Sequence, residues 1–295
     1  MNNAKYYIGT AGWNYDDWIG TFYSAKQSVR YNWLSYYSKF FNFVEVNSSF
    51  YTFLTPKIII EWLNILIDND EFKFSIKLHQ SFTHQKSFSK EDVKKVYSIL
   101  KLLTEENRIS GILLQFPYSF NFNTQNFDYL CFACELFLDY NIFVEFRHNS
   151  WINEKILNYF NDNKINLAAI DMPLIGDSLP LMLNKNQEIQ YIRLHGRNRI
   201  GWIKSIKRQL KEENISYDRN EKYNYLYSIE ELKDLANVIL NANLKSKIYY
   251  IVFNNHPQGK AIANALQMKG IVNPYKFEFI EKAEQIIRLI QNKSK

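Results

Sequence analysis

The chain has 295 residues, of which 46% are hydrophobic and 22% charged, a balance that excludes an intrinsically disordered protein. No apolar run approaches the ~18 residues that a transmembrane helix needs, and residues 1–5 begin no signal peptide, so we expect a cytoplasmic protein without membrane contacts. The net charge of +6 permits an anionic substrate or a nucleic acid without requiring either.

Short runs of β-branched and aromatic residues alternate along the chain with segments of helical spacing. Thr55-Pro56, Ser89 with Asp92, and the segment 228–231 are typical helix starts. Alternating strands and helices predict a parallel sheet, and eight such units predict one closed (β/α)8 TIM barrel over residues 1–295. A doubly wound open sheet is the competing fold. The predicted strands are 6–10, 43–47, 72–77, 111–116, 142–147, 167–171, 191–195 and 248–253.

Two intervals break this regularity. Residues 172–190 contain Pro173, Gly176 and Pro180 without clear helical spacing, which predicts that the sixth helix is missing or replaced by a loop. Residues 197–227 form a long insertion after the seventh strand, with eight Lys or Arg against four acids. This basic insertion is expected over the carboxyl ends of the strands, as a lid or as a nucleic-acid contact.

Polar residues gather at the carboxyl ends of the predicted strands. Side chains alternate across a strand, so Glu45, Glu145 and Arg193 each share a face with a second polar residue two positions on. Burying such pairs under helices would be costly, so they are expected to point into the barrel, where TIM barrels build their active sites. Lys77, Gln115 and Asp171 are expected to join these inward-pointing pairs. The catalytic candidates are Glu45, Lys77, Glu145, Arg147, Asp171, Arg193 and His195.

These residue types suit acid/base chemistry on an anion. Glu145 or Glu45 is the expected general base and His195 the general acid. Arg147 and Arg193 would clamp a phosphate or carboxylate, and Lys77 would be an electrostatic stabiliser or a Schiff-base nucleophile. The alternative is a structural ion-pair network that closes the barrel mouth.

Aromatic and amide residues near the same strand ends form a second group. Aromatic rings suit stacking against sugars or bases, and the amides and loop histidines supply hydrogen bonds. The substrate-binding candidates are Trp13, Tyr15, Asn47, Tyr51, His79, His84, Gln115, Trp151, Asn254 and Asn255.

A metal site is the weaker interpretation of the polar cluster. Glu45, Glu145, Asp171 and His195 offer oxygen and nitrogen ligands for one divalent ion, but the interleaved lysine and arginines would repel it. No HExxH motif is present. We therefore predict no cofactor and no metal ligands, with a divalent ion as the minor alternative.

Seven segments resemble the YecE-like family, a set of uncharacterised proteins. They follow one another in the family's order over most of the chain, and the resemblance implies a TIM barrel without supplying a reaction. Where the family often has an acidic residue after FNN, this chain has His256, which leaves the role of that position open. The segments are GTAGWNYDDWIGTFY (9–23), VEVNSSFY (44–51), FKFSIKLHQSFTH (72–84), GILLQFPYSF (111–120), VEFRHNSW (144–151), YIRLHG (191–196) and YIVFNN (250–255).

The leading hypothesis is a TIM-barrel enzyme that uses acid/base chemistry on a small anionic or polyhydroxylated substrate. The alternative is a nucleic-acid binding or processing protein that uses the basic insertion and the loop aromatics. A barrel that binds without catalysis is a third interpretation. The substrate, the bond that changes and the oligomeric state stay open at this point.

Overall fold

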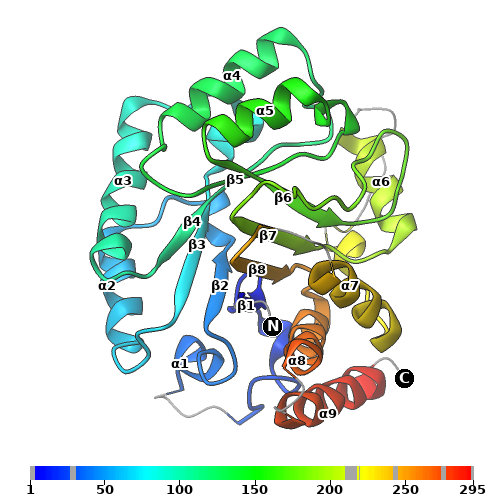
Figure 1. The fold of residues 1–295 in the computed structure, drawn as a ribbon. Helices are drawn as coiled ribbons and strands as arrows, with labels where there is room; N and C mark the ends of the chain where they lie inside the picture. The colour runs from blue at the N-terminus through cyan, green and yellow to red at the C-terminus, as the bar shows by residue number, and fades with distance from the viewer. Residues whose placement is uncertain are drawn as a thin grey trace.

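The chain folds as a parallel β-barrel surrounded by helices (Figure 1). This computed structural model describes residues 4–26, 31–209, 218, 220–241, 245–273 and 277–293. The alternation of eight strands with helices confirms the predicted (β/α)8 TIM barrel. The strands are β1 (Lys5–Thr10), β2 (Phe43–Val46), β3 (Lys73–Lys77), β4 (Ile109–Gln115), β5 (Ile142–Glu145), β6 (Ile165–Asp171), β7 (Ile189–Leu194) and β8 (Ile248–Phe253).

The helices depart from a regular barrel in three places, one of which is the interval between β7 and β8, where the described residues form two helices. Residues 172–188, between β6 and β7, contain no helix, as the sequence predicts. The final helix, α9, lies outside the eightfold pattern and packs against α8 (Figure 1). The helices are α1 (Trp33–Tyr37), α2 (Pro56–Ile65), α3 (Lys90–Glu105), α4 (Thr124–Glu135), α5 (Glu154–Asp162), α6 (Arg199–Gln209), α7 (Ile229–Asn241), α8 (Lys260–Val272) and α9 (Phe277–Lys293). None of those described has the length and apolar character needed to cross a membrane.

The predicted helix starts are present. Pro56 is the first residue of α2 and needs no hydrogen-bond acceptor for its nitrogen. At α3, the backbone N–H of Asp92 donates to Oγ of Ser89 at 3.2 Å and the N–H of Ser89 donates to Oδ2 of Asp92 at 3.0 Å. Ser228 and Glu231 make the same reciprocal pair before α7. Local sequence therefore fixes where these helices begin.

All strand pairs are parallel, in the order β1-β8-β7-β6-β5-β4-β3-β2. Among the described residues, β1 and β2 meet in a single bridge between Ala11 and Glu45. The barrel is thus nearly closed, with one junction that lacks a continuous ladder of backbone hydrogen bonds.

The hydroxyl group of Tyr37, from α1, joins the two sides of that junction. It accepts a hydrogen bond from the backbone N–H of Thr10 at 3.0 Å and donates one to the carbonyl of Phe43 at 3.1 Å. Gly9 permits β1 to lie close to β2 here, since a Cβ atom at this position would lie 2.0 Å from the Phe43 carbonyl oxygen.

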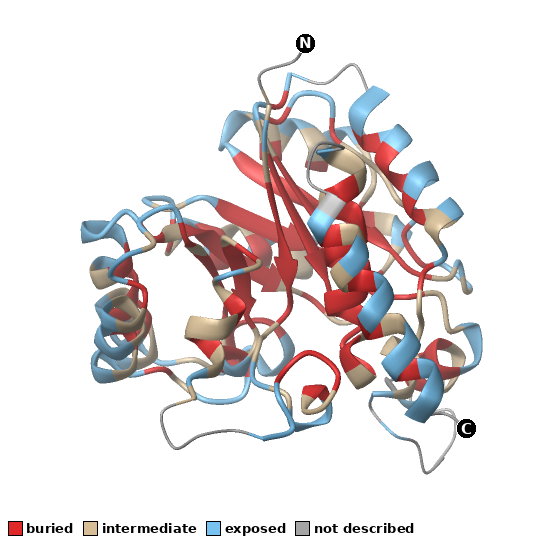
Figure 2. Ribbon diagram, turned by 90° about the horizontal axis from the view of Figure 1, so that it is seen from below, coloured by how far each residue is buried: buried red, intermediate tan, exposed pale blue. Residues whose placement is uncertain are grey.

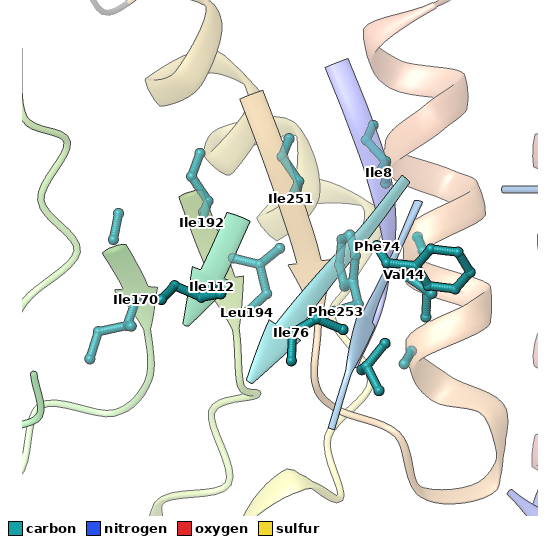
Figure 3. Packing of buried hydrophobic residues seen from close by; sticks show 14 of the residues in the cluster. Ile8, Val44, Phe74, Ile76, Ile112, Ile170, Ile192, Leu194, Ile251 and Phe253 are labelled. Carbon is teal, nitrogen blue, oxygen red and sulfur yellow. The ribbon is translucent and has the colours of Figure 1, made fainter. Parts of the chain in front are cut away.

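The strands are buried except at some of their end residues, and the exposed residues of the helices face outward (Figure 2). One apolar layer lies between strands and helices and includes Ile8, Ile112, Ile192 and Ile251 (Figure 3). A smaller layer fills the barrel interior. This inner layer lies deeper in the barrel than the polar side chains at the carboxyl ends of the strands, and we call it the apolar floor. It consists of Tyr7, Ala11, Phe43, Leu113, Phe143, Ala168, Tyr191, Tyr250 and Val252.

Candidate active site

Two carboxylates converge on one guanidinium just above the apolar floor. Nε and one terminal nitrogen of Arg193 donate to the two oxygens of Glu45 at 2.8 and 2.6 Å, and the other terminal nitrogen donates to Oε2 of Glu145. The hydroxyl of Tyr191 donates to Glu45 Oε2 at 2.8 Å. All four side chains are fully buried. Fixed donors therefore hold both carboxylates in place.

Arg147 connects this buried layer to the surface of the barrel mouth. Its guanidinium forms an ion pair with Glu145 Oε1 at 2.5 Å and lies 5.0 Å from the ring centre of Trp202 in α6. Burial alone would raise the pKa of Glu145, but the charges of Arg147 and Arg193 outweigh that effect and hold the pKa well below its usual value. Glu145 is thus an ionised carboxylate of low basicity.

His195 lies beneath the mouth and is fully buried. Burial, reinforced by the charge of Arg147, lowers the pKa of His195 well below its usual value, so the imidazole is neutral. A terminal nitrogen of Arg147 lies 3.1 Å from Nε2 and carries hydrogens, so Nε2 accepts. The ring proton then belongs on Nδ1. Nδ2 of Asn254 lies 2.9 Å from Nδ1, so we infer that the Asn254 amide is turned to present its oxygen to this proton.

Lys77 ends β3 and points into the mouth. Its ammonium lies 4.1 Å from the ring centre of Phe50, and among the described residues it makes no ion pair and no side-chain hydrogen bond. Burial, with the charge of Arg193, lowers the pKa of Lys77 to about 7, against the smaller opposing effects of Glu45 and Glu145. Neutral and charged forms of this amine are therefore both available near neutral pH.

A cavity of about 340 Å³ opens at the carboxyl ends of the strands. Its walls carry five cationic side chains and, among the residues that the structure describes, no carboxylate. Glu45 and Glu145 lie beneath it, so the basic side chains of the wall outnumber the two buried carboxylates. The lining residues are Asn47, Tyr51, Lys77, Gln115, Arg147, Arg193, Ser205, Arg208, Asn220, Lys222, Tyr223, Asn254 and His256.

The insertion after β7 supplies the lining residues that the sequence did not single out. Arg208 comes from α6, and Lys222 and Tyr223 come from the short turn that follows the part of the insertion outside the described residues. Nζ of Lys222 lies 4.9 Å from the ring centres of both Trp202 and Tyr223. The signal for these residues was available, since the insertion interleaves aromatic and basic residues over the expected active face.

A second cavity of about 580 Å³ adjoins the first through Asn47 and Tyr51, which line both. We call it the aromatic cleft, because rings from the β1 loop, α1 and α2 surround it. The predicted binding residues Trp13 and Tyr15 lie here, not in the cationic cavity. Its aromatic lining residues are Trp13, Tyr15, Tyr31, Trp33, Tyr51 and Trp62.

The expectation that Asp171 points into the barrel is wrong. In the sheet it pairs with Leu194, which faces the helices, so Asp171 shares that outer face. There its carboxylate accepts hydrogen bonds from Arg197 at 2.8 to 3.3 Å and from the hydroxyl of Tyr227 at 2.6 Å. Asp171 ties β6 to the insertion and does not join the cluster around Arg193.

Two predicted binding residues also lie outside the mouth. Nδ2 of Asn255 donates to Oδ1 of Asn264 in α8 at 2.8 Å, on the outer face of β8. Trp151 is fully buried, with its ring 4.2 Å from that of Phe146, and its Nε1 donates to the carbonyl of Phe120 at 2.6 Å. Both side chains make contacts within the protein and do not line the cationic cavity.

The loop histidines after β3 flank the mouth without lining the cationic cavity. The ring of His79 stacks on Phe53 at 4.2 Å, and its Nδ1 accepts from the N–H of Ser81. His84, on the same loop, packs its ring edge-on against Phe50 at 4.9 Å. Gln115, Asn47, Tyr51 and Asn254 do line the cavity, as the sequence predicts for binding residues.

The four side chains considered as metal ligands do not surround a common point. Arg193 occupies the position between Glu45 and Glu145, and Asp171 is on the other face of the sheet. In the part of the chain that the structure describes, no group of three or more His, Cys, Asp or Glu is placed to hold a metal ion.

Comparison with known proteins places this architecture among relatives of similar length. A family model described as "Protein of unknown function DUF72" matches residues 7–286. The UPF0759 protein YunF of Bacillus subtilis is 29% identical over 279 residues, covering 90% of this chain and 94% of that protein. A DUF72 family protein from Thermotoga maritima, known from a crystal structure, is 30% identical in sequence to this chain. The structural match covers 91% of this chain and 99% of that protein, with a TM-score of 0.77. A DUF72 family protein from Enterococcus faecalis, 22% identical over 91% of this chain and 95% of its own, shares the fold with a TM-score of 0.75.

Proposed function

The chain belongs to the DUF72 family, and from that premise we propose that it is an enzyme that uses acid/base chemistry on a small anionic substrate at the carboxyl ends of the barrel strands. We also propose that the YecE-like group is the branch of this family that its motifs match. The observation that carries the function is the cationic cavity of about 340 Å³, whose five positive side chains exceed the two carboxylates beneath it.

Arg147 is the proposed contact for the anionic group of the substrate. Its guanidinium lines the cavity, while Glu145 and the ring of Trp202 fix its position. One terminal nitrogen is occupied by Glu145 and His195, and the other donates to Sδ of Met172 at 3.3 Å. The second hydrogen of that other nitrogen can donate to an oxygen of a phosphate or carboxylate. Lys222 and Arg208, at the rim, add to the positive potential.

Lys77 is the proposed acid/base group. It lines the cavity, and its pKa of about 7 suits proton transfer near neutral pH. Glu145 and His195 lie beneath the cavity wall and are fully buried, so we assign them the role of positioning Arg147 and Arg193 instead of exchanging protons with the substrate.

Nucleic-acid binding is the less favoured function, because part of the positive charge of the basic insertion is neutralised by ion pairs within the protein. Arg197 pairs with Asp171 and with Glu231 at 2.8 Å, and Lys204 pairs with Glu221 at 2.9 Å. Retention on single-stranded DNA that weakens steeply with salt would restore this alternative.

Calorimetric titration with inorganic phosphate, at constant ionic strength, tests the proposed function. We expect saturable binding to one site and a loss of at least about tenfold in affinity for Arg147→Met. Lys101→Met, which removes one charge from an exposed pair on α3, is the matched control and should bind like the unaltered protein. Equal affinity in both variants would refute an anion site at the mouth.

A further inference from the structure

The amine of Lys77 faces the mouth and, within the described parts of the chain, has no polar partner. The side chain is 8% exposed, and the exposed part faces the cationic cavity. Its nitrogen lies 4.1 Å from the ring centre of Phe50. An aromatic ring attracts a cation more weakly than a carboxylate does and cannot form an ion pair with it. A buried lysine without a partner costs stability, so the fold retains this amine at the expense of a more stable apolar residue.

The nearby carboxylates are not available to Lys77. Glu45 receives two nitrogens of Arg193 and the hydroxyl of Tyr191, and Glu145 lies between Arg193 and Arg147. These donors lie in β7 or two residues beyond the end of β5, and burial fixes them. The lysine is therefore excluded from the ion-pair network although it projects from a strand into the same mouth.

We propose that Lys77 is a nucleophile that forms an imine with a small anionic carbonyl compound, such as a keto acid or the open-chain form of a sugar phosphate. This inference rests on the proposed function, because Arg147 and the rim cations would hold the anionic group while the carbonyl carbon faces the amine. It adds the substrate class and a covalent step to the acid/base role.

The step needs no oxidant or further cofactor. The nitrogen lone pair attacks the carbonyl carbon and forms a C–N bond, while the carbonyl π electrons move to oxygen. After the nitrogen loses a proton and the oxygen gains two, the C–O bond breaks, water leaves and the C=N bond forms. The protonated imine then accepts the electron pair of an adjacent C–H or C–C bond, so that bond breaks more readily.

Free amine is required for the attack, so the rate of imine formation should rise with pH through about 7. Arg147 and Arg193 oppose the charged form of the lysine, whereas Glu45 and Glu145 favour it. His84, on the loop after β3, is a further titratable neighbour, and burial and the charge of Lys77 lower its pKa. Lys222, Tyr223 and His256 line the same cavity as Lys77. The rate at Lys77 should level off above about 7, whereas an exposed lysine, with a pKa near 10.4, should keep gaining free amine and react faster up to that pH.

Reductive trapping of the full chain tests the proposal. The protein is incubated with glyoxylate or dihydroxyacetone phosphate and sodium cyanoborohydride at pH 7, and the adducts are located by peptide mass mapping. We expect one adduct per chain, on the peptide that contains Lys77, at least about tenfold faster than on any other lysine. The map of the unaltered protein gives this answer even if a Lys77 variant folds poorly.

Lys77→Arg should abolish the adduct, and Lys73→Arg is its matched control. Lys73 lies on the same face of β3 at the opposite end of the strand, where its amine bonds to the carbonyl of Asn107. Label spread evenly over the lysines, no label with either probe, or unchanged labelling of Lys77→Arg would overturn the imine. If trapping fails while phosphate still binds, the proposed function survives. If phosphate does not bind, the proposed function fails independently.

Discussion

Arg193 and Glu45 form a bidentate ion pair in the interior of the barrel, at 2.6 and 2.8 Å, with both side chains fully buried. The pair spans from β7 to β2, strands that are not neighbours in the sheet. It thus connects separate parts of the barrel through its interior and sets the height at which the cationic cavity begins.

Arg193→Met should strongly destabilise the protein, because it leaves Glu45 without its ion-pair partner and removes one of the two partners of Glu145. We expect a loss of about 3–5 kcal/mol in the free energy of unfolding, measured by urea denaturation. Arg288→Met breaks an exposed pair with Glu284 on α9 and should cost less than about 0.5 kcal/mol. Similar losses in the two variants would contradict the assigned role of the central pair.

Lys77→Met should stabilise the protein at pH 6, since it removes an unpaired buried charge. The lysine has a pKa of about 7 when folded and about 10.4 when unfolded, so between these values the unfolded chain binds more protons and stability rises with pH. The advantage of the variant, up to about 5 kcal/mol at pH 6, should therefore shrink as the pH rises from 7 towards 10. Melting temperatures of the two proteins measured across this range test the sign, and a constant difference would refute it.

His195 should remain neutral as the pH falls from 7 to 5, because burial and the charge of Arg147 lower its pKa. Nitrogen-detected NMR of the imidazole groups should show one ring with its proton on Nδ1 and no titration in this range. The resonance is assigned by its absence in His195→Gln. A titration midpoint at or above about 6.5 would contradict the placement of this ring beside Arg147.

Asp171→Asn should weaken the fold without weakening anion binding. The change removes the charge that holds Arg197 and Tyr227, and we expect a loss of about 1–3 kcal/mol in the free energy of unfolding. Phosphate affinity, measured by calorimetry, should stay within about twofold of the unaltered protein. A large loss of phosphate affinity with little loss of stability would contradict this prediction and indicate that Asp171 belongs to the active site.

The barrel and the centre of its mouth could be predicted from the sequence because two periodicities specify them. Alternating runs mark the strands, and a charged pair two residues apart, such as Glu145 with Arg147, must face inward, since the outer face packs under helices. The same argument fails for single polar residues. Asp171 and Asn255 each lie one position away from the inward face, and one residue of register decides which face a side chain takes.

Other features depend on contacts that are remote in the sequence. Nothing local distinguishes Trp151, which packs on Phe146 and Phe120, from the aromatic side chains that line the aromatic cleft. The contribution of Lys222 and Tyr223 to the cationic cavity follows from how the insertion folds back over the mouth. Such placements arise from tertiary packing and leave little signal in any one segment.

The junction between β1 and β2, held by the hydroxyl of Tyr37, has a dynamic consequence for the aromatic cleft. Without a continuous ladder, this junction should open more often than the other strand pairs, so the amide hydrogen of Thr10 should exchange with solvent earlier than those of central β7. Trp13 and Asn47, which follow the two strands, lie on the cleft wall. A ligand that touches both residues would bind the closed barrel preferentially, and the exchange rate at Thr10 would then report on occupancy of the cleft.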